Sequence, residues 1–582
     1  MKRPVRIANI SGFYGDRESA MREQLEGGSV DVLTGDYLAE LTMLILARTK
    51  QRQPDGGYAR SFVAQLADVL ELVLDRGVKV VVNAGGLDPH GCAAAVQAVA
   101  VERGRAPVVA SITGDNLMER LTEFQADEPF VNTQTGEPAR QPFVVANAYL
   151  GGWGVTEALN QGADIVVTGR VTDAALVSGT AAWWHGWGRY DYDRLAGSVV
   201  AGHVIECGMQ ATGGNYSFFD EIDDLRYPGF PWAEIADDGS SVIGKHPGTG
   251  GAVTRETVVS QLLYEIGSPA YLGPDVTARF DTVQLKQIGV DRVQVSGVRG
   301  EAPPETLKVA AATPGGYRNT MTVGITGLNQ QLKAALVHEQ IWAMIPFEAS
   351  DFDEVYETII GTEQANPATN GSAVSLWQLS VSSADEAMVG RVFANAATQT
   401  VLGNIPGMFA LGPPSGAQPF ARYWPTSIAR HRITQSVAVG DRLFLVEETD
   451  PMPGAPLMVN LPAVGWPDDR DTVSVPLGAV VGARSGDKGG SANLGLYART
   501  EAGFRWLAEF LSIHQLRLIV PELEQLEVDR YELPNLWAVN FVIHGLMGDG
   551  VSSSLRLDPQ AKGLGEYVRA KVVDVPVALV SA

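Results

Sequence analysis

The segment GARSGDKGGSANLG, residues 482–495, combines ionisable side chains with a glycine-rich backbone. It places Arg484, Asp487, Lys488 and Asn493 among five glycines. Arginine can hold a carboxylate or phosphate through two parallel hydrogen bonds, lysine adds a point charge, and glycine lets backbone N–H groups approach an anion. We predict a flexible loop that binds the anionic group of a substrate at a crevice of the large domain or of a neighbouring subunit. A tight turn with a local ion pair is the alternative.

Another set of polar residues follows the short β-branched runs in the first third of the chain. Five such runs end in the turns SGFYGD, TGDYLAE, NAGGLDPHG, TGDN and TGRVTD. Aspartates in these turns can cap the next helix, but capping does not explain an arginine, which the helix dipole disfavours at that end. Ligands of open α/β sheets bind at the carboxyl ends of the strands. We therefore assign catalysis to Asp36, Asn83, Asp115, Arg170 and Asp173, and substrate binding to Gly85 and Gly86.

A glycine-rich turn precedes a later amphipathic helix. The stretch GKHPGTGGAVT contains Lys245, Gly250 and Gly251, and Thr254 can cap the helix that follows. Free N–H groups at a helix N-terminus attract anions. We assign Lys245 to the catalytic group and the two glycines to substrate binding.

The stretch GHVIECG carries three reactive side chains at helical spacing. His203, Glu206 and Cys207 would share one helix face, which suits metal ligation or a Cys–His pair. The alternative is a capped helix with a buried cysteine. We assign His203 and Glu206 to substrate binding and predict no essential metal, because the sequence contains neither H-E-x-x-H nor paired C-x-x-C spacing.

The elements that position these residues point to an α/β fold. Strands alternating with helices predict a mostly parallel sheet covered on both faces. Longer alternating strands from about residue 281 predict an α+β region, and the proline-rich stretch after residue 450 predicts a linker. We expect the following parts: a large N-terminal domain at 1–455, with a parallel-sheet part at about 1–235 and an α+β part at about 245–455; a linker at 456–475; and a small α/β sandwich at 476–582.

Composition excludes several classes of protein. The 582 residues carry a formal net charge of −23, which argues against nucleic acid or an anionic membrane as a partner. Two cysteines and the lack of a long apolar run favour the cytoplasm. No G-x-G-x-x-G follows an early strand, and the P-loop and G-x-S-x-G patterns are absent. We predict no cofactor.

Several of these motifs, in order, resemble one family. The family is the acyclic terpene utilisation protein A (AtuA) family, and the motifs that look like it are SGFYGD, TGDYLAE, NAGGLDP, GADIVVTGRVTDAAL, GHVIECGMQATGGN, GTGGAVT…QLLYEI and ARSGDKGGSANLGLYAR. The resemblance implies a large N-terminal domain and a C-terminal ferredoxin-like domain. It also implies a role in the breakdown of acyclic terpenes such as citronellol and geraniol, whose intermediates are CoA thioesters. Genes of the family often accompany acyl-CoA carboxylases.

Two functions are consistent with these observations. The first is a catabolic lyase, hydratase or hydrolase acting on a branched or acyclic-terpene-derived acyl substrate, either a carboxylate or a CoA thioester, so that CoA enters as part of the substrate. The second is a non-catalytic partner or scaffold of an acyl-CoA carboxylase system. An enzyme requires the polar strand ends to converge, whereas a scaffold requires a large exposed apolar patch. In either case we expect a homo-oligomer.

Overall fold

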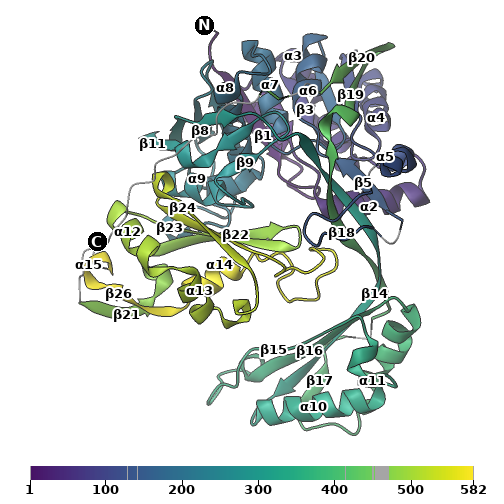
Figure 1. Ribbon diagram of the computed structural model, residues 1–582, viewed down its shortest axis with the longest axis vertical. Helices are drawn as coiled ribbons and strands as arrows, with labels where there is room; N and C mark the ends of the chain where they lie inside the picture. The colour runs from purple at the N-terminus through teal and green to yellow at the C-terminus, as the bar shows by residue number, and fades with distance from the viewer. Residues whose placement is uncertain are drawn as a thin grey trace. The chain divides into compact units, whose positions relative to one another are not determined.

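The computed structural model describes residues 2–127, 129–139, 142–412, 415–448, 451–452 and 471–580 (Figure 1). The chain divides into two compact units. Unit 1 comprises Met1–Ala312, Trp424–Gly548 and Gln560–Ala582, and unit 2 comprises Thr313–Tyr423 and Asp549–Pro559. Within the described ranges, no helix is long and apolar enough to cross a membrane.

Five parallel strands form the middle of the main sheet in unit 1. Their order is β1 (Val5–Ser11), β2 (Val32–Gly35), β3 (Lys79–Val82), β6 (Ile165–Thr168) and β4 (Val109–Thr113). These strands are rich in Val and Ile and almost wholly buried, as expected for parallel strands covered on both faces. Their carboxyl ends share one edge of the sheet.

Antiparallel strands extend this sheet to eleven on both sides. Beyond β1 lie β7 (Pro231–Ile235), β8 (Ser241–Lys245), β12 (Arg292–Ser296) and β11 (Gln284–Gly289). Beyond β4 lie β19 (Thr434–Val439) and β20 (Arg442–Glu447). Residues far beyond the first third of the chain therefore complete the sheet that the first strand begins.

Helices cover both faces because alternate strand residues point to opposite sides. Ala8 and Val80 pack in one core with α1 (Ala20–Gly27), α3 (Arg60–Asp75) and α4 (Pro89–Glu102). Ile7 and Val81 pack in another core with α6 (Trp153–Asn160), α7 (Ala175–His185) and α8 (Tyr192–Ile205). The prediction of an α/β fold is confirmed. Helix α2 (Glu40–Arg52) follows β2, and α5 (Leu121–Asp127) follows β4.

Shorter elements follow α8. Thr254 caps the start of helix α9 (Arg255–Leu262): its side chain accepts a hydrogen bond from Thr257 N, and the Thr257 hydroxyl accepts one from Thr254 N. This confirms the predicted cap. A three-stranded sheet then combines β9 (Ala270–Leu272), β10 (Thr277–Arg279) and β13 (Arg299–Glu301).

Unit 2 has a hydrophobic core of its own, which includes Trp377 and Phe393. The long strand β14 (Thr306–Thr326) pairs with β5 (Val145–Ala148) through its unit 1 residues. Within unit 2, β14 pairs with β16 (Val374–Ser383) and β17 (Met408–Ala410). The rest of this unit includes β15 (Glu354–Ile360), α10 (Gln330–Met344), α11 (Phe393–Thr400) and the first half of β18 (Gln418–Ala429).

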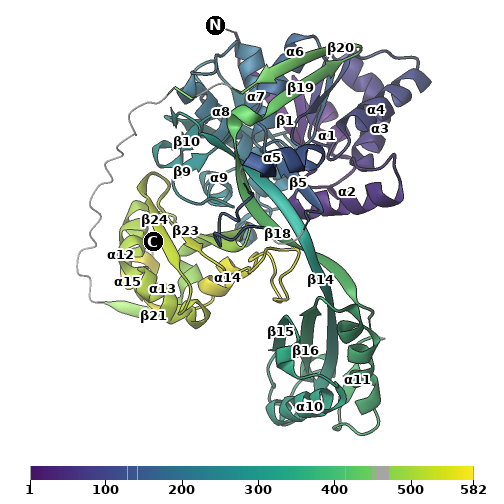
Figure 2. The same cartoon turned by 45° about the vertical axis from the view of Figure 1, so that its right-hand side comes forward.

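The C-terminal region is a four-stranded antiparallel sheet with helices, seen from two sides in Figures 1 and 2. Its order is β22 (Val481–Lys488), β23 (Ser491–Ala498), β25 (Ala538–Ile543) and β24 (Val528–Leu533). Helices α12 (Glu501–Phe510), α13 (Ile513–Ile519) and α14 (Leu564–Arg569) share its core. A separate pair joins β21 (Thr472–Pro476) to β26 (Val572–Pro576), which leads into α15 (Val577–Val580). Most of the predicted linker, residues 456–470, lies outside the described residues.

Candidate functional site

The end of β2 and the end of β3 hold two predicted site residues in direct contact. Asn83 donates from Nδ2 to Asp36 Oδ1 at 2.5 Å and accepts from the backbone N–H of Tyr37 at 2.7 Å. Both side chains are buried. Burial, followed by the nearby charge of Asp173, raises the pKa of Asp36 well above its ordinary value. Burial therefore favours the protonated form of Asp36.

Asp115 supports the neighbouring turn after β6. Its Oδ2 accepts from Arg170 N at 2.8 Å and from Asn147 Nδ2 at 2.7 Å. A Cβ on Gly169 would lie 2.3 Å from Asp115 Oδ1, so glycine is required there. Burial raises the pKa of Asp115 to about 6. Asp115 thus fixes the backbone that carries Arg170.

Arg170 links these strand ends to the start of the next helix. Its Nη1 donates to Asp173 Oδ1 at 2.6 Å and to Leu38 O at 3.2 Å. The guanidinium lies 4.3 Å from the ring centroid of Tyr149. The sequence left an arginine at this turn unexplained, and the structure shows that it bridges the turns after β2 and β6.

The end of α8 brings a histidine and a second carboxyl group. His203 Nδ1 lies 3.1 Å from Glu206 Oε1, and the His203 ring packs against Tyr271 and Phe280. Burial lowers the pKa of His203 to about 4. Burial, and then the charges of Asp173 and Glu265, raise the pKa of Glu206 well above its ordinary value. His203 is therefore a neutral imidazole at pH 7, and burial favours the protonated form of the Glu206 carboxyl group beside it.

Cys207 follows in the same turn. Burial, and then the charge of Glu206, raise the pKa of its thiol well above the ordinary value, so a reactive thiolate is disfavoured. Among the described residues, no group of three or more His, Cys, Asp or Glu side chains is arranged to hold a metal ion.

Residues 482–495 form a β-hairpin, and this corrects the predicted flexible loop. Strands β22 and β23 pair up to Lys488 and Ser491, which leaves Gly489 and Gly490 as a two-residue turn. Gly489 has φ of 65°, which glycine adopts without strain.

Other glycines of the hairpin allow close packing. A Cβ on Gly486 would lie 2.6 Å from a ring carbon of Tyr264, and one on Gly495 would lie 2.7 Å from Leu263 Cβ. These glycines let the hairpin approach the residues that end α9.

The hairpin places Lys488 beside the residues that follow α9. Lys488 Nζ donates to Glu265 O at 2.9 Å. The protein atoms packed around Lys488, followed by the charge of Lys308, lower its pKa to about 8, although the residue is exposed to solvent. Burial, and then the charge of Glu265, raise the pKa of the adjacent Asp487 to about 7. Both groups therefore titrate near neutral pH.

These charges form one group, which we call the strand-end cluster. Asp173 acts electrostatically on both Asp36 and Glu206, and Arg170, Glu265 and Lys488 also act on Glu206. The cluster comprises Asp36, Arg170, Asp173, Glu206, Glu265 and Lys488. It combines carboxyl groups whose protonated form is favoured by burial with two basic side chains, an arrangement suited to acid–base chemistry on an anionic or carbonyl-bearing substrate.

Asn493 and the glycines after β3 have other roles. Asn493 accepts from Glu265 N at 2.9 Å and donates to Leu263 O at 3.0 Å, so its amide fastens the hairpin to the end of α9. Gly85 N donates to Thr168 O at 3.0 Å, and Gly86 N donates to Asn83 O at 3.3 Å. These polar groups are used within the protein.

Lys245 and the glycine turn after it contact residues outside the strand-end cluster. Lys245 Nζ lies 3.0 Å from Asp291 Oδ2 and donates to Thr249 O at 2.7 Å. Gly251 N donates to Asp224 O at 2.6 Å, and Gly250 O accepts from Gly229 N at 3.0 Å. The structure thus gives Lys245 a buried ion pair with Asp291 in place of contact with the other predicted catalytic residues.

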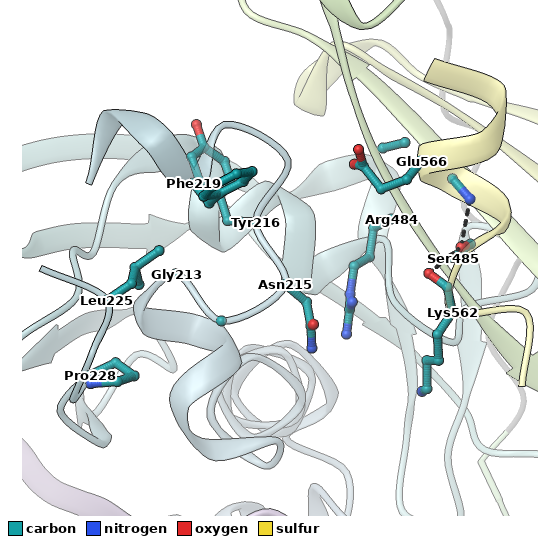
Figure 3. Close-up of a pocket in the computed structure, with 13 residues that line it drawn as sticks. Gly213, Asn215, Tyr216, Phe219, Leu225, Pro228, Arg484, Ser485, Lys562 and Glu566 are labelled. Atoms are coloured by element: carbon teal, nitrogen blue, oxygen red, sulfur yellow. Dashed lines mark hydrogen bonds between the residues drawn. The ribbon is translucent and has the colours of Figure 1, made fainter. Parts of the chain in front are cut away.

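Arg484 lies on β22, four residues before Lys488, at a cavity of about 440 Å³. It donates to Gln210 Oε1, and its guanidinium lies 4.1 Å from the Tyr264 ring centroid. Figure 3 shows Arg484, Asn215 and Lys562 with their polar ends directed to the same side of the cavity.

Three residues that contribute to the site escaped the sequence analysis. Glu265 follows α9 with φ of 55°, Lys308 lies on β14, and Tyr149 follows β5. Lys308 Nζ lies 4.7 Å from the Tyr149 ring centroid. Sequence spacing assigns none of them a role at the site, although Glu265 lies in the stretch QLLYEI, so only long-range folding could reveal that role.

Comparison with known families agrees with this architecture. The sequence profile described as "Acyclic terpene utilisation family protein AtuA" matches residues 5–439. The profile described as "AtuA ferredoxin-like domain" matches residues 475–574. A search of curated proteins finds no match.

Proposed function

This chain belongs to the acyclic terpene utilisation family AtuA, and from that premise we propose that it is a catabolic enzyme acting on a branched or acyclic-terpene-derived acyl substrate. The substrate is a carboxylate or its CoA thioester, and the reaction is acid–base chemistry of the lyase, hydratase or hydrolase type. The observation that carries the proposal is the strand-end cluster, in which two carboxyl groups with raised pKa lie with Arg170 and Lys488.

The cluster contains a complementary acid and base for such a reaction. Burial disfavours the charged form of Glu206 and raises its pKa, which suits it to act as the acid. Lys488, with its pKa lowered to about 8, exists partly as the free amine at that pH. In a hydration, the amine would take a proton from water as the oxygen bonds to carbon, and the acid would deliver a proton to the neighbouring carbon. The reverse transfer would eliminate water.

Positive charge beside the acid and base has a separate role. Arg170 and protonated Lys488 favour an oxygen on which negative charge develops, such as the carbonyl oxygen of a thioester in its enolate form. Asp115 and Asn83 act as positioning residues, since the first holds the backbone of Arg170 and the second holds Asp36.

The test is a turnover assay of the full chain with citronellyl-CoA, geranyl-CoA and the corresponding free acids, with products identified by mass spectrometry. We expect gain or loss of water or release of CoA. Lys488→Met should lower kcat by about 100-fold or more, the usual contribution of a general acid or base. The matched control is Lys286→Met, an exposed lysine on β11, which should retain parental turnover.

The alternative of a non-catalytic carboxylase partner gives a different result. In that case no probe would be converted, and Lys488→Met and Lys286→Met would behave alike. Turnover that is equal in all three proteins would also contradict the assignment of Lys488.

A further inference from the structure

The cavity of about 440 Å³ beside Arg484 is built from two parts of unit 1. Residues 213–228 supply one wall, with Tyr216, Phe219 and Leu225 among its apolar side chains. The C-terminal domain supplies the other, with Arg484 and Lys562 (Figure 3). The volume lies within the range of small-molecule sites in proteins.

The charge of Arg484 is the first reason to expect a ligand. Arg484 is only 5 % exposed, and its guanidinium contacts the amide of Gln210 and the ring of Tyr264. Among the described residues, no carboxylate lies within ion-pair distance of Arg484, although the charge of Glu265 acts on it electrostatically. A buried cation without a counter-charge is costly. An anion in the cavity would supply that counter-charge.

Other charges at the cavity strengthen this conclusion. Glu566 also lines it, but Arg569 Nη1 donates to both oxygens of the Glu566 carboxylate at 2.8 and 2.7 Å. Lys562 contributes a second cation, 4.3 Å from the Tyr264 ring centroid, and its Nζ lies 3.6 Å from Glu265 Oε1. Glu566 and Lys562 thus have charged partners within the protein, which leaves Arg484 as the group of this wall where an anion would add a counter-charge.

The opposite wall of the cavity offers apolar surface for the remainder of the ligand. The residue Phe219 is 64 % exposed, although it is a large apolar side chain beside a cavity. Leu225 and Pro228 extend this surface. Apolar surface opposite a cationic wall matches an amphipathic anion.

We propose that this cavity binds the anionic end of the acyl substrate, with a phosphate or carboxylate at Arg484 and an apolar group against Phe219. The inference deepens the proposed function and rests on it for the substrate class. Arg484 and Lys488 lie four residues apart on the same face of β22, which separates their Cα atoms by about 13 Å. An elongated thioester can therefore extend from the cavity toward the strand-end cluster.

The test is calorimetric titration of the full chain with three probes: CoA, adenosine 3′,5′-bisphosphate and citronellate. The first two present phosphate, and the third presents a carboxylate, so the pattern identifies the anionic group. Arg484→Gln should weaken the probe that binds by about 10- to 150-fold, the range expected for hydrogen bonds to a charged group. Because Arg484 is buried, Lys562→Gln and Phe219→Ala are tested in parallel; each should weaken the same probe.

The matched control is Arg499→Gln. Arg499 belongs to the same domain and also contacts the 213–228 wall, since it forms an ion pair with Glu221 at 2.6 Å, but it does not line the cavity. This variant should bind the probe like the parent. Equal weakening by Arg499→Gln, unchanged binding in the three cavity variants, or no binding of any probe to the parent would overturn the inference.

Binding and turnover separate this inference from the proposed function. Probe binding that depends on Arg484, without conversion of any acyl substrate, would uphold the cavity and reject the proposed reaction. Conversion that depends on Lys488, with probe binding unaffected by Arg484→Gln, would do the reverse.

Discussion

At the scale of single residues, Glu206 and Lys488 are each shifted toward the neutral form by burial. The pKa of Glu206 lies well above its ordinary value of 4.5, and that of Lys488 lies at about 8 instead of 10.5. Neutral groups of both kinds can exchange protons with a substrate near pH 7. The shifts also make the free energy of unfolding depend on pH, with opposite signs for the two residues.

For Glu206, we expect stability to fall with rising pH. The folded protein retains the proton above pH 4.5, where the unfolded chain releases it, so this residue's contribution to the free energy of unfolding decreases as pH rises from 4.5 toward the raised pKa. Glu206→Gln removes that dependence. Melting temperatures of parent and variant between pH 5 and 9 should converge at low pH, with the variant more stable at high pH.

If the melting temperatures of the parent and Glu206→Gln changed in parallel between pH 5 and 9, Glu206 would have its ordinary pKa and the prediction would be wrong. The control is Glu532→Gln on β24, which removes a carboxylate whose Oε1 lies 2.7 Å from Arg530 Nη1. It should not raise the melting temperature at high pH.

Lys488 should be chemically reactive as an amine. Since its pKa is about 8, roughly half of its side chains are unprotonated at pH 8, and acetic anhydride should acylate it faster there than a lysine-containing model peptide. Peptide mapping by mass spectrometry across pH 6–11 measures the midpoint. A midpoint near 10.5 would contradict the assignment.

The same shift fixes the sign of the stability effect. Between pH 8 and 10.5 the unfolded chain binds more protons at this lysine than the folded protein does, so its contribution to the free energy of unfolding rises with pH. Lys488→Met should flatten that rise.

At the scale of elements, the hairpin of β22 and β23 positions Lys488 by packing against the end of α9. Gly486→Ala should disturb this contact because its Cβ would meet the Tyr264 ring at 2.6 Å. We expect a loss of about 1–3 kcal/mol in the free energy of unfolding, typical of overpacking, together with reduced turnover. Urea denaturation measures the first effect.

A control for this variant is Gly403→Ala, in unit 2. Nothing lies within 4 Å of a Cβ at Gly403, so the change should leave stability close to that of the parent. A similar stability for Gly486→Ala would mean that the hairpin can shift away from α9 without cost.

At the scale of the whole molecule, the two units have separate hydrophobic cores. Every residue of the strand-end cluster belongs to unit 1, whereas Trp377 lies fully buried in the core of unit 2. Trp377→Ala should destabilise unit 2 by about 3–5 kcal/mol, the usual cost of removing a large buried ring. Differential scanning calorimetry should show one transition moving to lower temperature and another unchanged.

Activity and ligand binding show whether unit 1 stays folded when unit 2 is destabilised. Both should survive Trp377→Ala at temperatures below the unit 2 transition. A single transition that shifts as a whole would show that the two units unfold as one cooperative structure.

The sequence by itself determined the α/β architecture, the cap at Thr254 and the family. These depend on local patterns: buried runs of Val and Ile, a Thr at a helix start, and motifs in a fixed order. The same local reasoning misjudged the segment 482–495, because its glycines serve contacts with Leu263 and Tyr264, more than two hundred residues earlier. Sequence spacing carries no information on such contacts.

Only the tertiary structure decided which polar residues meet. Lys245 follows the same pattern of strand end and glycine turn as Asp36, but its ammonium pairs with Asp291. Sequence spacing gives Glu265 and Lys308 no role at the site, and they act on Lys488 because the hairpin, the end of α9 and β14 converge there. Burial then sets which of these groups are charged, since the cost of burying a charge depends on every atom that surrounds it and on no single stretch of sequence.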